Sequence, residues 1–241
     1  MRKAKLILSC EHGGNKLPSP WDKQVAIPKK VLASHRGWDI GALELTLALQ
    51  RAGASQVFIH EVSRLLIELN RSLHHPKLFS EFCEKLSQDE RKLLIQNIHL
   101  PYRSKVAMAI QSHYSKGKDV WHVSVHSFTP VLEGVERQAE IGILYDPARE
   151  GEKQFAKAWR DLLKNKLGDR YRIRMNYPYR GTADGFVTAL RKTFHSDRYV
   201  GIELEVNQGL YRDPIRWNEM SKALQQTLLT LVNKGMVSWT S

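Results

Sequence analysis

Two histidines stand where predicted β-strands end, and their positions suggest a metal site. His12 follows an apolar run and precedes two glycines, and His126 ends an alternating run that is rich in valine. Catalytic zinc is commonly held by two histidines and one carboxylate, with a fourth position left open for water. The sequence has neither a His-Glu-x-x-His helix nor a Cys-x-x-Cys pair. The ligands of such a site would therefore come from segments that are far apart in the chain.

Three acidic residues are candidates for the rest of the chemistry. Asp39 precedes a predicted helix, so it is either the N-cap of that helix or a carboxylate ligand of the metal. Glu203 and Glu205 alternate along an apolar strand and therefore point to the same face. Two such acids are costly unless they are paired, bound to a metal or share a proton. A general base is one interpretation, and a solvated strand face or pairing with arginines is the other.

Several basic and amide side chains could bind an anionic group of a substrate. Asn70 and Arg71 follow a predicted strand, and Arg180 lies in a polar, glycine-rich loop. The guanidinium fork of arginine matches a carboxylate, so these side chains indicate a small anionic substrate. Arg137 is a further candidate, and surface ion pairs with nearby acids are the alternative for each arginine.

Strand-like and helix-like segments alternate along the chain. Strands are predicted at residues 3–9, 56–60, 64–69, 120–126, 141–145, 171–175 and 199–206, and helices at 40–52, 88–98, 101–114, 150–166, 183–194 and 214–232. Ser87 and Glu90 have the spacing of a capping box at the start of the second of these helices. This interleaving predicts an α/β fold, a three-layer sandwich around a mixed, largely parallel central sheet. Ligands of such folds lie beyond the carboxyl ends of the strands, where the candidate residues are placed. No linker-like segment divides residues 1–241, so we expect a single domain.

Composition narrows the class of protein. The chain has 241 residues, of which 42% are hydrophobic, and its net charge is +12. The basic residues are scattered and form no tail, which favours a solvated basic surface over a nucleic-acid site. No apolar run approaches the roughly 20 residues that span a bilayer, and the first apolar run is too short for a signal peptide. These features predict a cytoplasmic protein without a membrane partner, and they leave the oligomeric state open.

The order of six short motifs is similar to that of a known family. The motifs are Cys-Glu-His-Gly-Gly at 10–14, Gly-Trp-Asp-Ile-Gly at 37–41, Glu-Leu-Asn-Arg at 68–71, Val-His-Ser at 125–127, Asn-Tyr-Pro-Tyr-Arg-Gly at 176–181 and Leu-Glu-Val-Asn-Gln-Gly-Leu at 204–210. Together they resemble the N-formylglutamate amidohydrolase (N-formylglutamate deformylase) family over about residues 6 to 213. The resemblance implies a phosphorylase/hydrolase-like fold, related to zinc carboxypeptidases and aspartoacylases, with one zinc ion.

The resemblance also implies roles for individual residues. His12 and His126 match the metal histidines of the family, and Glu205 matches its acid, which takes the general-base role. The carboxypeptidase-type pattern would place a glutamate three residues after the first histidine, where this chain has Asn15. The carboxylate ligand must therefore come from elsewhere, and the resemblance implies Asp39, because its motif recurs in the family, with Glu68 as the alternative. Asn70 and Arg71 match a pair that binds the substrate carboxylate in related carboxypeptidases, and Arg180 is expected to assist them. The type reaction converts N-formylglutamate to formate and glutamate.

The chain departs from the best-known deformylases at two positions. It has Cys-Glu-His-Gly-Gly where they tend to have Pro-His-(Ser/Ala)-Gly, and it has Glu203 where a neutral residue is common. These differences affect the choice of substrate more than the chemistry. The rival hypotheses are a metallo-carboxypeptidase or cell-wall amidase acting on a larger substrate, and a non-catalytic protein that binds anions or nucleic acid. A third is a hydrolase that uses the Cys10 thiol, although a free cysteine is more often a small buried residue.

Overall fold

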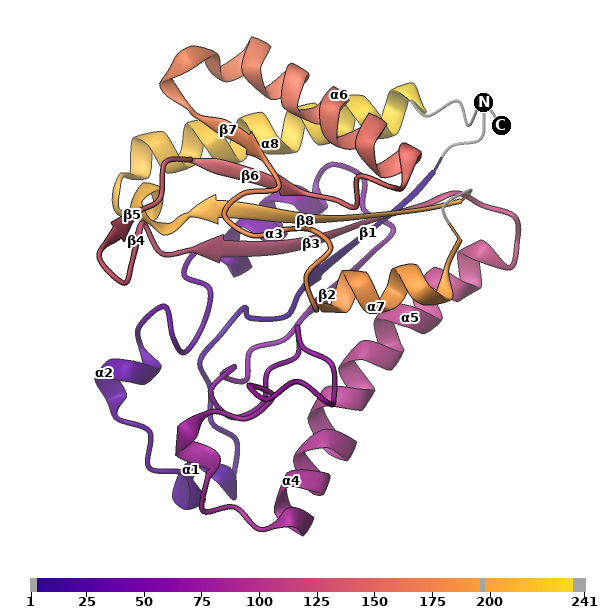
Figure 1. Cartoon of the computed structure of the whole chain (residues 1–241). Coiled ribbons are helices and arrows are strands. Elements are labelled where there is room, and N and C mark those ends of the chain that lie inside the picture. Colours follow the sequence, from indigo (N-terminus) through magenta and orange to yellow (C-terminus); the bar gives the residue numbers. More distant parts are fainter. Residues whose placement is uncertain (1–3, 196–197, 236–241) are drawn as a thin grey trace.

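The computed structural model describes residues 4–195 and 198–235, and a six-stranded sheet forms its centre (Figure 1). The strands are β1 (Lys5–Cys10), β2 (Gln56–Ile59), β3 (Val120–Phe128), β6 (Ile141–Leu144), β7 (Ile173–Met175) and β8 (Tyr199–Asn207). Their order is β2-β1-β3-β8-β6-β7. The first four run parallel, β6 is antiparallel to β8, and β7 is parallel to β6. The predicted mixed, largely parallel sheet is therefore confirmed.

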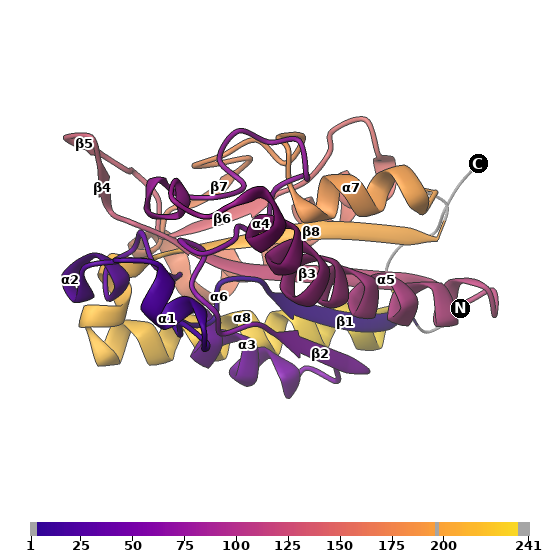
Figure 2. The same cartoon turned by 90° about the horizontal axis from the view of Figure 1, so that it is seen from below.

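Helices cover both faces of the sheet, which completes the predicted three layers. One face carries α3 (Ala42–Gln50), α6 (Glu150–Leu167) and α8 (Pro214–Lys234), and the other carries α5 (Leu100–Tyr114) and α7 (Phe186–Thr193). Figure 2 shows α5 and α7 from the side of the second face, with α8 behind the strands. The remaining elements are α1 (Trp21–Gln24), α2 (Lys29–Leu32), α4 (Gln88–Leu94), a π-helical turn (Ile95–His99), a hairpin of β4 (Val131–Leu132) and β5 (Val135–Glu136), and 3-10 turns at Glu81–Cys83, Gly168–Arg170 and Gln208–Arg212.

The two central strands have one apolar face and one face that becomes polar. On β8, Val200, Ile202 and Leu204 pack into the core under α3, α6 and α8. Side chains alternate along a strand, so Glu203 and Glu205 point to the opposite face. β3 follows the same pattern and is buried along its whole length. Buried acids and histidines therefore gather near the carboxyl ends of neighbouring strands, on the face that α5 and α7 cover.

Two local signals gave opposite outcomes. Ser87 and Glu90 form the predicted capping box at the start of α4, where Ser87 Oγ accepts from Glu90 N at 3.3 Å. The predicted strand over 64–69 is wrong, because this segment forms turns. Its apolar side chains, Leu66 and Leu69 among them, are buried in the apolar cluster that also includes residues of α5 and α7, and this burial explains the strand-like pattern. The first predicted strand, residues 3–9, corresponds to β1. Its first residue, Lys3, lies outside the described residues.

Within the described residues, no helix combines the length and the apolar character that crossing a membrane would require.

Candidate active site

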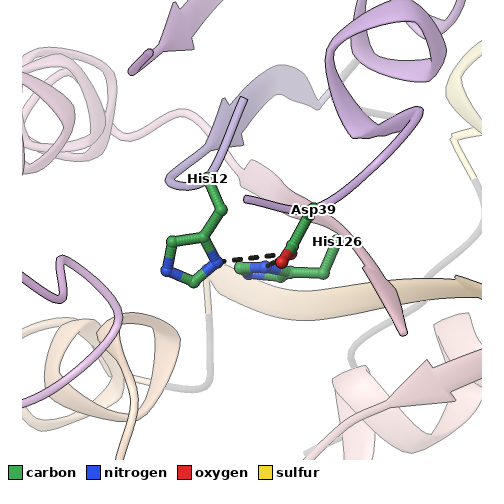
Figure 3. Close-up of side chains that lie close together, drawn as sticks. All are labelled: His12, Asp39 and His126. Atoms are coloured by element: carbon green, nitrogen blue, oxygen red, sulfur yellow. Dashed lines mark hydrogen bonds and ion pairs between the residues drawn. The ribbon is translucent and has the colours of Figure 1, made fainter. Parts of the chain in front are cut away.

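Three side chains from separate loops and strands converge at the carboxyl end of the sheet (Figure 3). His12 follows β1, His126 lies near the end of β3, and Asp39 lies in the loop before α3. Asp39 Oδ2 is 2.9 Å from His126 Nδ1 and 3.2 Å from His12 Nδ1. All three side chains are buried, and their ligand atoms lie within 4.8 Å of one another. The structure therefore brings together two imidazoles and one carboxylate that could hold a metal ion.

The backbone explains why Asp39 takes this place. Its amide N–H donates to the His12 carbonyl at 3.0 Å, which ties the two loops together. The N-cap of α3 is Gly41, whose φ of 84° lies in the left-handed region that favours glycine. A Cβ at Gly41 would also come within 2.8 Å of the rings of Tyr211 and Trp217. The Asp39 carboxylate is thus not used as a helix cap and points to the histidines.

The second nitrogen of each imidazole has its own partner. His12 Nε2 pairs with Glu68, and His126 Nε2 lies 2.8 Å from Ser124 Oγ and 3.1 Å from Glu11 Oε2. Histidines that bind a metal commonly donate their other ring N–H to a carboxylate, which fixes the tautomer and the orientation of the ring. Both imidazoles therefore present Nδ1 to the centre of the cluster.

Glu11 is the functional candidate that the sequence reasoning missed. It is completely buried, and its carboxylate accepts hydrogen bonds from Ser124 Oγ and, at 3.0 Å, from Tyr102 Oη. Burial alone would raise the pKa of Glu11, but hydrogen bonding and charge interaction with His126 hold it far below its ordinary value. The available signal was the alternation of polar Ser9 and Glu11 at the end of an otherwise apolar strand.

Glu68 and Arg64 support the cluster from one side. Arg64 Nη1 donates to Asp39 Oδ1 at 2.9 Å, and its Nε donates to Glu68 Oε2 at 2.7 Å. Burial would raise the pKa of Glu68, but Arg64 and His12 hold it far below its ordinary value. Glu68 thus lies behind His12 as a partner of its Nε2, and Asp39 is the carboxylate that faces both histidines.

The surroundings of the two histidines favour a positive charge on the imidazole rings. Burial lowers the pKa of His126, but hydrogen bonds to Asp39 and Glu11 raise it well above its ordinary value. Burial and Arg64 lower the pKa of His12, whereas Glu68 and Asp39 raise it, and the net shift is upward. Surroundings that favour a protonated imidazole favour a cation in general, and a metal ion competes with the proton for the same nitrogen. The donor set and its charge thus fit a metal ion.

Glu205 lies beside the cluster without a partner for one oxygen. It is directly opposite His126 in the pairing of β3 with β8. Its side chain is buried, and Oε2 has no hydrogen-bond partner in the part of the chain that the structure describes. Burial, reinforced by the charges of Asp39 and Glu203, raises the pKa of Glu205 to about 8. A buried carboxyl with one unpaired oxygen and a raised pKa can exchange a proton with a bound molecule.

A cavity of about 140 Å³ contains the cluster and Glu205. It is also lined by the three residues expected to bind substrate, Asn70, Arg71 and Arg180. Arg71 donates to the carbonyl of Asp184, while the Arg180 side chain lies in an exposed loop. A larger hollow of about 710 Å³ adjoins it and shares Arg64. We place the site in the smaller cavity because His12, Asp39, His126 and Glu205 all line it.

The remaining candidates lie outside this cavity or are buried. Burial raises the pKa of Cys10 to about 12, so its thiol is a poor nucleophile, as expected for a small packed residue. Arg137 stacks between Phe128 and Tyr179, with its Nη2 donating to Tyr179 Oη at 3.0 Å. His122 is buried and hydrogen-bonds to Ser9 at 2.8 Å.

Solved structures with the same fold cover nearly the whole chain. A gene product from Agrobacterium tumefaciens is 24% identical with a TM-score of 0.81, and the match covers 98% of this chain and 92% of that chain. N-formylglutamate amidohydrolase from Ralstonia eutropha is 18% identical with a TM-score of 0.72, and the match covers 98% of this chain and 96% of that chain. At these identities the likeness shows the fold.

The family is shown by the sequence itself. No curated protein sequence matches this chain. The model of the N-formylglutamate amidohydrolase family, however, matches residues 4–212. This range contains the two histidines, Asp39 and Glu205, and it confirms the resemblance drawn from the six motifs. The match spans most of the chain, and the protein therefore belongs to the N-formylglutamate amidohydrolase family.

Proposed function

We propose that this protein is a zinc-dependent amidohydrolase that removes a small acyl group from the nitrogen of a carboxylate-bearing amino acid. The observation that carries the proposal is the cluster of His12, Asp39 and His126 beside the unpartnered Glu205 oxygen, all in one cavity. Family membership supports the class of reaction. N-formylglutamate is the reference substrate, because the family takes its name from this compound.

Zinc suits this donor set better than harder cations do. Two imidazole nitrogens and one carboxylate oxygen are common ligands of catalytic zinc, whereas magnesium and calcium prefer all-oxygen sites. When bound, a zinc ion would supply Lewis acidity that polarises the acyl carbonyl and acidifies water. His12, His126 and Asp39 would hold it. Glu68 and Glu11 would keep the two imidazoles in the tautomer that leaves Nδ1 free for the metal.

The other cavity residues have complementary tasks. Glu205, with its free Oε2, accepts the proton of the attacking water and delivers it to the leaving amine nitrogen. Arg180 and Arg71 lie where a substrate carboxylate can accept hydrogen bonds from guanidinium groups. The side chain of Asn70 is fixed because its Oδ1 accepts from Phe186 N at 2.6 Å. A cavity of about 140 Å³ favours a small substrate over a peptide-like one.

Metal content and formate release should be measured in one preparation of the full chain. We expect about one zinc per chain and release of formate from N-formyl-L-glutamate that a chelator stops and added zinc restores. Zinc without release would retain the metal site and exclude this substrate. A chain without zinc and without release would contradict the proposal, and a salt-sensitive gel shift with nucleic acid would then support a binding protein.

Replacing Glu11 with glutamine tests the partner behind His126. Glutamine keeps the size of the side chain but loses the charge that orients the His126 ring. We expect zinc affinity, measured by competition with a chelator, to fall about 10- to 100-fold. Glu133→Gln, on the exposed hairpin, is the matched control and should leave zinc affinity unchanged. An unchanged affinity in Glu11→Gln, with only a lower melting temperature, would assign Glu11 a purely structural role.

A further inference from the structure

Glu203 is a buried acid that the proposed mechanism does not use. It lines the same cavity as Glu205, and its side chain is only 7% exposed. In the pairing of β3 with β8 it lies opposite Ser124, one side-chain step before Glu205 on the same face. Two residues of a strand span roughly 6.6 Å. Glu203 is therefore set apart from the catalytic carboxyl by about the length of a short amino-acid side chain.

Among the described residues, Glu203 has a hydrogen bond and favourable charges nearby, but it forms no ion pair. Asn70 forms a side-chain hydrogen bond to it, and a carboxylate has further acceptor sites. Among residues 4–195 and 198–235, no lysine or arginine forms a salt bridge with Glu203. His126 and, less strongly, Arg191 contribute favourable charge interactions. The nitrogens of Arg191, however, donate to Glu152 Oε1 at 3.0 Å and to the carbonyl of Gly201 at 2.8 Å.

An acid in this position is costly to the folded protein. Burial raises the pKa of Glu203, since the nearby positive charges do not offset the loss of water. Buried carboxylates are normally paired, and an unpaired one lining a cavity can obtain its partner from a bound molecule. The opposite charge lies on the same cavity at Arg71 and Arg180. The cavity thus offers arginines that can bind an anionic group and, at Glu203, a carboxylate that can bind a cationic group.

We infer that Glu203 determines substrate specificity, and that the preferred substrates are small N-acyl amino acids whose side chain carries a cation. This inference rests on the proposed function for the reaction and narrows its class of substrate. The α-carboxylate binds near Arg71 and Arg180, and the cationic side chain donates to Glu203. An acidic side chain, as in N-formylglutamate, would meet the like charge of Glu203 and is the poorer substrate.

A length-matched series of formyl amino acids tests this assignment. The probes are Nα-formyl-L-ornithine, N-formyl-L-glutamine and N-formyl-L-glutamate, with formate release measured on the zinc-loaded full chain. We expect kcat/KM to decrease in that order. In Glu203→Gln, which keeps the size of the side chain and its hydrogen bond to Asn70, the preference for ornithine over glutamate should fall about 10- to 100-fold. Glu133→Gln makes the same change of charge on the exposed hairpin and should leave the preference unchanged.

Binding of the free amino acids keeps the two proposals apart. Calorimetry with L-ornithine and L-glutamate reports on Glu203 without any turnover. Tighter binding of L-ornithine that is lost in Glu203→Gln supports the assignment, even if no formyl compound is hydrolysed, in which case only the proposed reaction fails. Hydrolysis or binding that favours glutamate, and that Glu203→Gln leaves unchanged, would overturn the assignment while keeping the hydrolase.

Discussion

Replacing His126 with alanine should abolish both stoichiometric zinc binding and turnover. The substitution removes one of two imidazole donors and leaves Asp39 with His12 alone. Loss of the metal removes several kcal/mol of charge stabilisation in the transition state, and each 1.36 kcal/mol corresponds to about tenfold in rate. We therefore expect kcat/KM to fall on the order of 10³-fold or more. Metal analysis after dialysis and the rate of formate release measure the two effects.

His122→Ala is the structural control for this experiment. His122 lies on the same strand and the same face, is equally buried, and is hydrogen-bonded to Tyr199 Oη at 3.0 Å. Removing it leaves buried hydroxyls unpaired and should cost about 1–3 kcal/mol of stability, but zinc should stay bound. If His126→Ala keeps stoichiometric zinc, the assignment of the ligands is wrong. His126→Asn serves as a second variant if the alanine variant does not fold.

Much of the fold could be predicted because local signals and the final structure agree. Alternation along β8, the capping box at Ser87 and the long amphipathic α6 each act within a few residues. The segment around Leu66 and Ile67 was wrongly predicted as a strand. It is a loop buried in the apolar cluster that includes α5 and α7, and such burial produces apolar runs like those of a strand. Periodicity reports burial, and it distinguishes a buried strand from a buried turn only when the segment is long.

The candidate site could be predicted in part, for a topological reason. His12 and His126 follow or end parallel strands that are neighbours in the sheet, so their side chains must meet at one edge. From the residues alone, Asp39 is either a helix cap or a metal ligand, and only the resemblance favours the ligand, because a residue in an irregular loop has no register that the sequence could fix. The pairing of Arg64 with Asp39 and Glu68 depends on that loop as well, and spacing alone does not reveal it.

Glu205→Gln should lower kcat about 10²- to 10⁴-fold while zinc stays bound. Glutamine has the shape of glutamate but cannot accept the proton of the attacking water. In the wild type, activity should be lost as the pH falls through the pKa of Glu205, because the protonated carboxyl is no base. A bound cation lowers that pKa from its metal-free value of about 8. The acid limb of the pH profile should be absent in the variant, and Glu205→Asp should retain it at reduced rate.

The metal-free protein gives an independent test of the same residue. Burial raises the pKa of Glu205 from its ordinary 4.5 to about 8, so folding favours the protonated carboxyl. The protonated Glu205 carboxyl contributes its full stabilisation to the folded state below about pH 4.5, and this contribution is lost as the pH rises through 8. Thermal unfolding should therefore show a decline of stability over this window that is smaller in Glu205→Gln. In the zinc-loaded protein, two results for Glu205→Gln would contradict the assignment. Loss of zinc from this variant would make Glu205 a metal ligand, and full activity of this variant would exclude Glu205 as the base.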